Sequence, residues 1–148
     1  MIFKAQTEWV KPTEFPDLTQ VDEIAIDLET HDPHLKSMGS GSVIGSGKVV
    51  GIAVATDGYS GYFPFDHGGG GNIEKSKVIQ WFTDICKSDS RKIFHNAMYD
   101  VCWIRSMGIK INGEMVDTMI AASLVNENRY RYDLGSLGWD YLGQGKNE

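Results

Sequence analysis

The sequence predicts a single α/β domain with a mixed sheet, in which three antiparallel strands are followed by strand–helix units and helices flank the sheet. The chain has 148 residues, the size of one domain with one core. Hydrophobic residues make up 41% and charged residues 23%, which excludes bulk disorder and a membrane-embedded chain. Short apolar runs come first, and segments with helical periodicity follow.

The first part of the chain predicts three strands after an irregular lead-in. Two prolines and mixed polarity indicate a surface segment over residues 1–22, with the folded domain over 23–148. The run EIAIDL at 23–28 predicts a central strand buried on both faces. A loop rich in glycine, serine and histidine is expected over 31–48, and Asp57-Gly58 is a hairpin turn signal. The second and third predicted strands are 49–55 and 61–65.

The second part predicts strand–helix units. Apolar residues recur at helical spacing from Val78 to Cys86, after a mobile glycine loop. Asn96 and Asp133 are placed as helix N-caps. The later predicted elements are a strand at 91–95, a helix at 97–107, a strand at 114–116, a helix at 118–125 and a last helix containing 134–142. This order is typical of the ribonuclease-H-like architecture, whereas a Rossmann domain begins with a βαβ unit.

Charge and cysteine content narrow the function classes. The net charge of -6 excludes a protein that holds nucleic acid by non-specific cationic attraction, so a nucleic-acid role must be local and helped by metal ions or a partner. Cys86 and Cys102 are predicted to be free thiols, because two cysteines at this spacing fit neither a disulfide framework nor a zinc site. There is no signal-peptide pattern and no membrane-spanning run, so we expect a cytoplasmic protein.

Two other patterns are set aside. The glycines between 39 and 51 have spacings like a dinucleotide fingerprint, but that fingerprint needs a strand before it and a helix after it, and here a strand follows. His31 and His34 flank Asp32 in the predicted loop, and such a segment is more often a polar turn than a metal site.

Two carboxylates end the most apolar predicted strand. Asp27 and Glu29 are spaced i, i+2, and the two-residue period of a strand turns both side chains to one face. Adjacent anions at the edge of an apolar sheet repel one another, and a divalent cation is the simplest remedy. Solvated acids at a frayed strand end would give the same pair, so a site needs a third ligand.

The segment HNAMYD supplies a third carboxylate. With Asn96 as N-cap, Asp100 lies one turn into the helix and points back toward the end of the strand. The carboxyl ends of strands in an open sheet form the crevice where ligands bind. We therefore expect Asp27, Glu29 and Asp100 to converge there. The alternative for this segment alone is an ordinary first-turn acid favoured by the helix dipole.

Taken together, IAIDLET and IFHNAMYD resemble the first two signature motifs of the DEDD superfamily of 3′-5′ exonucleases. The step from Asp117-Thr118 into MIAASLVNE resembles the one after the second motif in the proofreading domains of family A DNA polymerases, and DLGSLGWDYLG resembles their next helix. The resemblance runs from about residue 21 to residue 148. Because Met1 lies close before it, the parent resembles a phage-type polymerase that begins with its exonuclease domain.

The third motif of that family, Tyr-x-x-x-Asp or His-x-x-x-x-Asp, has no match near the end of the chain. Asp133 and Asp140 have neither a tyrosine four residues before them nor a histidine five residues before them. His95 and Asp100 fit the histidine form, but this assignment leaves no convincing second motif. We therefore interpret 23–148 as a partial exonuclease domain that ends before its third motif, and we expect little or no activity from the isolated chain.

The resemblance implies phosphodiester hydrolysis with two Mg²⁺ or Mn²⁺ ions, which releases nucleoside monophosphates. In that scheme Asp27 bridges both ions, Glu29 holds the first ion and helps to orient the attacking water, and Asp100 holds the second ion. Oxygen ligands alone suit Mg²⁺ or Mn²⁺ better than zinc. The candidates for contacts with the terminal nucleotide are Thr30, His95 and Asn96.

The implied partners are a single-stranded DNA 3′ end and the polymerase domain of the parent chain, which would deliver the strand. A ribonuclease-D-like RNA exonuclease shares these motifs, and a preference for the 2′-hydroxyl is not readable from these residues. The D-T-M-I-A-A step and the absence of a basic tail favour DNA. A catalytically inactive nucleic-acid-binding fragment of the same fold is the other alternative, although the intact carboxylates argue against it for the parent.

Overall fold

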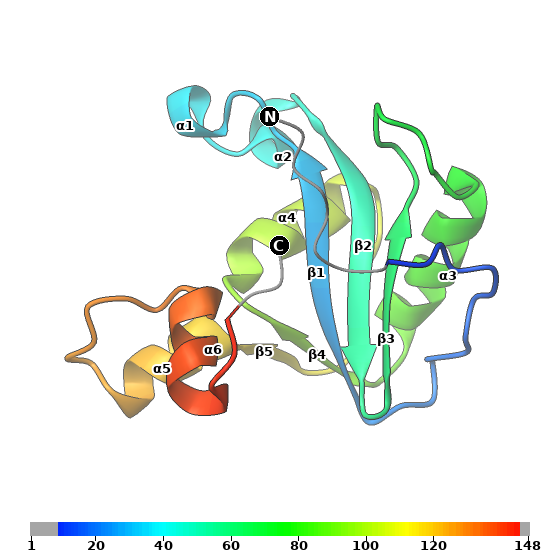
Figure 1. The fold of residues 1–148 in the computed structure, drawn as a ribbon. Helices are drawn as coiled ribbons and strands as arrows, with labels where there is room; N and C mark the ends of the chain where they lie inside the picture. Colours follow the sequence, from blue (N-terminus) through cyan, green and yellow to red (C-terminus); the bar gives the residue numbers. More distant parts are fainter. Residues whose placement is uncertain (1–8, 146–148) are drawn as a thin grey trace.

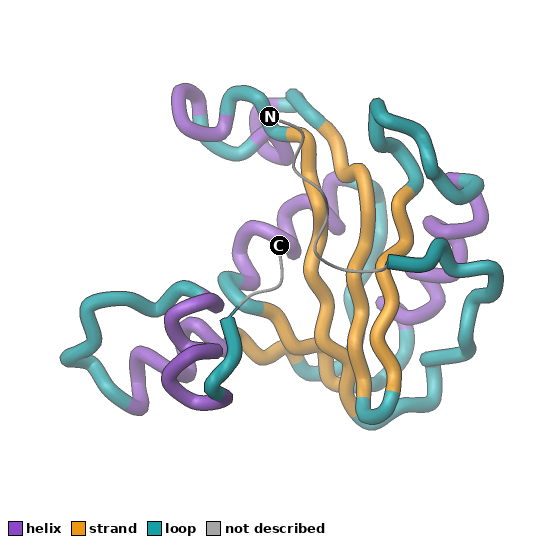
Figure 2. The backbone as a smooth tube through the Cα atoms, in the orientation of Figure 1, coloured by secondary structure: helices purple, strands orange, loops and turns teal. Residues whose placement is uncertain are grey.

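The computed structural model describes residues 9–145 as a five-stranded mixed sheet with helices around it (Figure 1, Figure 2). The strand order is β3-β2-β1-β4-β5, in which β1, β2 and β3 are antiparallel neighbours, β4 pairs in parallel with β1, and β5 pairs in parallel with β4. The strands are β1 (Glu23–His31), β2 (Lys48–Thr56), β3 (Tyr59–Pro64), β4 (Arg91–Phe94) and β5 (Met115–Asp117). The predicted ribonuclease-H-like fold class is confirmed.

The helices follow the predicted order, with two additions. The segment 31–48, expected to be a loop, contains the last residue of β1, the first of β2 and two four-residue helices, which are too short to leave a periodic signal in the sequence. The helices are α1 (Leu35–Met38), α2 (Gly41–Ile44), α3 (Lys75–Lys87), α4 (Ala97–Ser106), α5 (Thr118–Val125) and α6 (Leu134–Leu142).

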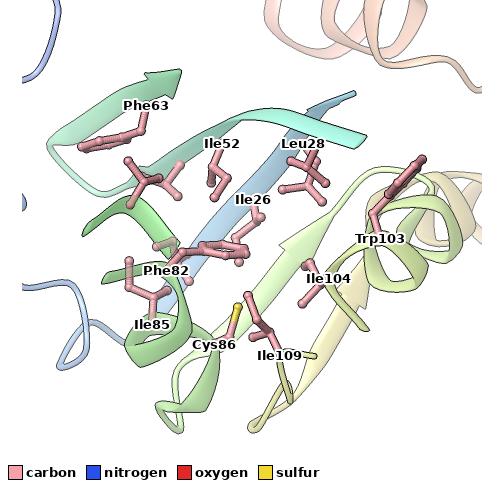
Figure 3. Close-up of a cluster of buried hydrophobic side chains, with 14 of the residues drawn as sticks. Ile26, Leu28, Ile52, Phe63, Phe82, Ile85, Cys86, Trp103, Ile104 and Ile109 are labelled. Atoms are coloured by element: carbon pink, nitrogen blue, oxygen red, sulfur yellow. The ribbon is translucent and has the colours of Figure 1, made fainter. Parts of the chain in front are cut away.

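The core lies between one face of the sheet and the helices α3 and α4 (Figure 3). Alternate residues of β1 point into it because a strand has a period of two. The core side chains come from these elements, with Ile24, Ile26 and Leu28 from β1, Ile52 from β2, Phe63 from β3, Phe82 and Ile85 from α3, and Trp103 and Ile104 from α4. Cys86 is buried there as a free thiol and Cys102 is half-buried and free, as predicted.

The other face of the sheet is open among the described residues, so the expectation that the first strand is buried on both faces is wrong. A cavity of about 580 Å³ lies on this face, lined mainly by small or apolar side chains that include Ala25, Ala53 and Ala55. The helices α3 and α4 both contribute to the core on the opposite face. This open face could not be predicted from the sequence, because alanines in a strand are typical of interior positions.

The described part of the expected lead-in is irregular. Residues 9–22 form no helix or strand, and their apolar side chains pack against the body of the domain. Phe15 stacks on Phe63, and the indole of Trp81 donates a hydrogen bond of 2.8 Å to the Pro16 carbonyl. The expectation for residues 1–8 lies outside the described residues.

Candidate active site

Two of the predicted carboxylates lie on β1, which continues past its predicted end to His31, so that Asp27 is in the middle of the strand and Glu29 is near its carboxyl end. Asp27 and Glu29 are exposed, whereas Leu28 between them is buried in the core. Asp27 lines the cavity on the open face. The register between β1 and β2 shifts between Glu29 and Thr30, which is a bulge that changes the local direction of the strand.

Asp100 meets β1 at the same point. Its side chain is 4% exposed, and its Oδ1 atom accepts a hydrogen bond of 3.0 Å from the backbone N–H of Leu28. Pairing between β1 and β4 ends at Ala25, and three residues further on the N–H of Leu28 is bound by Asp100 of α4 instead of by a strand. The carboxylate of Asp100 therefore lies against the backbone between Asp27 and Glu29.

Burial makes ionisation of this carboxyl group costly. The pKa of Asp100 is raised to about 6, mainly by desolvation and to a smaller extent by the negative charges of Asp27 and Asp117, although the hydrogen bond from Leu28 lowers it. A cation beside the group would relieve both effects. The donor set of carboxylate oxygens suits a hard divalent ion such as Mg²⁺ or Mn²⁺.

The three predicted ligands do not form a closed metal cluster in the structure. Among residues 9–145 there is no group of three histidine, cysteine, aspartate or glutamate side chains placed to hold a metal ion. The structure brings Asp100 to the Asp27–Glu29 segment, while the side chains of Asp27 and Glu29 remain in solvent. The carboxylate oxygens of these residues are the ligand type that Mg²⁺ or Mn²⁺ prefers, and such an ion would stabilise the buried carboxylate of Asp100.

The turn before α4 is built differently from the prediction. Asn96 precedes the helix in a left-handed conformation with φ of 66°, and its side chain makes no capping hydrogen bond. The carboxylate of Asp117 accepts hydrogen bonds from the backbone N–H groups of Asn96 at 3.1 Å and Ala97 at 2.8 Å. It also caps its own helix, α5, by accepting from Met119. Asp117 thus joins the starts of two helices beside the site.

Sequence reasoning missed this role of Asp117, although an aspartate directly before a helix is a common N-cap. Its four backbone donors hold the pKa of Asp117 below the usual value, against the effect of desolvation. The structure therefore keeps this carboxylate ionised as a structural anchor.

His95 lies at the edge of the cavity. The hydroxyl of Thr118 donates a hydrogen bond to the Phe94 carbonyl at 3.1 Å. The Thr118 oxygen can therefore accept a hydrogen bond from His95 Nδ1–H at 2.9 Å. In the neutral ring Nε2 is then an acceptor, and it is buried without a partner among the described residues. Asn96 is exposed, and Thr30 is half-buried next to Tyr99.

Comparison with known proteins identifies the family. A family model described as 3′-5′ exonuclease, of the family A DNA polymerase type, matches residues 13–147. The chain belongs to this family of 3′-5′ exonuclease domains, as the two motifs predicted.

Polymerases of two phages are similar in sequence. A DNA polymerase DpoZ of Salmonella phage PMBT28 is 30% identical over 86% of this chain and 18% of its own length. A DNA-directed DNA polymerase of Pseudomonas phage M6 is 29% identical over 96% of this chain and 22% of its own length. The chain therefore spans about a fifth of the length of these relatives.

A similar fold is found in the structure of Brucella melitensis NrnC with bound Mg²⁺. The TM-score is 0.62 at 20% identity, over 88% of this chain and 58% of NrnC. At this identity the likeness shows the shared fold.

The helices of residues 9–145 include none with the length and apolar character that a membrane span requires.

Proposed function

We propose that this chain carries part of the 3′-5′ exonuclease site of a DNA polymerase, of the DEDD type, which hydrolyses the terminal phosphodiester bond at a DNA 3′ end. The observation that supports it most is the buried carboxylate of Asp100 on the N–H of Leu28, between Asp27 and Glu29. Burying this acid near the acidic Asp27 raises the cost of its ionisation, and a bound cation would offset that cost.

Each carboxylate has a proposed role. Two divalent ions, when bound, would supply Lewis-acid stabilisation and an activated water for the displacement. Asp27 would be shared between the two ions from the end of β1. Glu29 would hold the first ion and accept a hydrogen bond from the attacking water. Asp100 would hold the second ion from α4, on the side of the leaving 3′ oxygen.

The fold around the carboxylates would position the substrate. The hydroxyl of Thr30, the ring of His95 and the amide of Asn96 lie on segments at the same end of the sheet and are proposed to contact the terminal nucleotide. A fourth carboxylate and the tyrosine or histidine of the third motif would come from a segment outside this sequence. Residues 23–148 would then be a partial exonuclease domain, with residues 1–22 as its lead-in.

Charge bears on how the strand would reach the site. The chain carries a formal charge of -6, so bound divalent ions would offset repulsion of the phosphodiester backbone. The polymerase part of a longer parent protein is the proposed partner that delivers the 3′ end.

An exonuclease assay tests the proposal. The chain extended through a third motif should shorten a labelled single-stranded DNA from its 3′ end with Mg²⁺ or Mn²⁺, and Asp27→Ala should abolish this while the thermal unfolding curve stays cooperative. Parallel DNA and RNA oligonucleotides of one sequence distinguish the substrate classes. Undiminished cleavage by Asp27→Ala, or cleavage in excess chelator, would contradict the mechanism.

A further inference from the structure

Tyr99, the residue before Asp100, ties α4 to the end of β1 through its hydroxyl group. The Tyr99 hydroxyl lies 2.8 Å from the Thr30 hydroxyl and 3.3 Å from Asp32 Oδ2. Asp100, the next residue of the same helix, binds the N–H of Leu28. The helix α4 thus contacts the strand end on both sides of Glu29.

The direction of these hydrogen bonds follows from the groups involved. An ionised carboxylate accepts only, and it is the strongest acceptor in the cluster, so the Tyr99 hydroxyl donates to Asp32. Its oxygen then accepts from Thr30, and the phenol is engaged by one donor and one acceptor. Both hydrogen-bond partners of the Tyr99 hydroxyl belong to the residues that follow Glu29.

The segment after β1 is built to hold Asp32 in place. The N–H of Gly41, at the start of α2, donates to the same Asp32 Oδ2 atom at 2.9 Å. A Cβ atom at residue 41 would lie 1.9 Å from the Ser46 carbonyl oxygen, so the loop closes around Asp32 only with glycine there. Asp32 is therefore a fixed acceptor for Tyr99.

Glu29 sits at the bulge, where a strand is least constrained by its own ladder. The residue before it is held by Asp100, and the residue after it is held by Tyr99. We propose that Tyr99 is a positioning residue that fixes Glu29 relative to Asp100, so that both carboxylates can bind one cluster of divalent ions. This inference rests on the proposed function, because it assigns Glu29 to a metal site.

Mn²⁺ binding tests the inference on the 148-residue chain without any assay of cleavage. Isothermal titration calorimetry compares the natural chain, Tyr99→Phe, Glu29→Gln and the double variant. Tyr99→Phe removes the hydrogen bonds to Thr30 and Asp32 and should thereby weaken Mn²⁺ binding roughly three- to tenfold. In the Glu29→Gln background the same change should have no effect, because the carboxylate that Tyr99 positions is gone.

A merely structural role would give a different pattern, in which Tyr99→Phe weakens binding equally in both backgrounds. That result, or unchanged affinity in Tyr99→Phe, overturns the inference. Tyr59→Phe is the matched control, because Tyr59 lies beside the β2–β3 turn at the opposite end of the sheet and its variant should bind like the natural chain. If the natural chain and Glu29→Gln bind Mn²⁺ equally, the proposed metal site itself is wrong, and the inference is overturned with it.

Discussion

The substitution Asp100→Asn should stabilise the metal-free protein at neutral pH. The ordinary pKa of an aspartate is 3.8, and burial raises that of Asp100 to about 6 in the folded state. The folded protein therefore binds this proton more tightly than the unfolded chain does. The protonated Asp100 therefore makes its full contribution to the unfolding free energy below about pH 4, and this contribution is lost as the pH rises through about 6.

The magnitude follows from the size of the shift. A difference of roughly two pKa units corresponds to about 3 kcal/mol of unfolding free energy at pH 7.5, as an upper bound. Asparagine stays neutral, and its side-chain oxygen can still accept the hydrogen bond from Leu28. In a chain of this size about 3 kcal/mol corresponds to a rise in Tm of roughly 6 to 12 °C.

Urea unfolding in chelator at pH 4.5, 6 and 7.5 measures this effect. The stability difference between Asp100→Asn and the natural chain should be about 1 kcal/mol at pH 4.5 and should rise to about 3 kcal/mol at pH 7.5. Asp84→Asn, at an exposed carboxylate of α3, is the matched control and should change stability little across this range. An Asp100→Asn variant that is no more stable at pH 7.5, or equally stabilised at pH 4.5, would refute the reasoning.

Three further predictions concern single side chains. Asp117→Ala should lower the unfolding free energy by about 2 kcal/mol or more in urea titrations, and Asp133→Ala by about 1 kcal/mol. The reason is that Asp117 serves the starts of two helices, whereas Asp133 serves only α6. Equal losses would contradict the double role of Asp117. In native protein a thiol reagent should modify Cys102 well before Cys86, because burial raises the pKa of Cys86 to about 12 and removes it from solvent, and equal rates would argue against that burial. Gly41→Ala should lower Tm by several degrees. Gly58→Ala at the hairpin turn should lower Tm less, because its new Cβ atom meets no neighbouring atom and only the positive φ is unfavourable. A larger loss of Tm in Gly58→Ala than in Gly41→Ala would show that the α2 segment is not closed around Asp32.

The strands and long helices could be predicted because their signals are local. The alternation in β1 identified the face that carries Asp27 and Glu29, and the segment before Asp100 identified a strand followed by a helix. Asp133 was placed correctly as an N-cap from its position alone, and its carboxylate accepts from Ser136. Such features depend on residues within one or two turns of each other.

The parts that could not be predicted depend on contacts between distant residues. Tyr99 meets Thr30 and Asp32 only after α4 has packed beside β1. Asp117 replaces the expected cap of Asn96 because β5 lies next to β4, which brings its end to the start of α4. The short helices α1 and α2 depend on closure around Asp32 and leave no periodic pattern.

The position of bound Mn²⁺ tests the metal site most directly. Crystals of this chain soaked in Mn²⁺, with anomalous diffraction at the manganese edge, should show an ion at the carboxyl end of β1 with oxygen atoms of Asp27 and Asp100 about 2.2 Å from it. The peak should disappear in Asp27→Asn crystals grown and soaked identically. Manganese bound only elsewhere on the molecule, or a peak that survives unchanged in Asp27→Asn, would contradict the assignment of these carboxylates to a nuclease site.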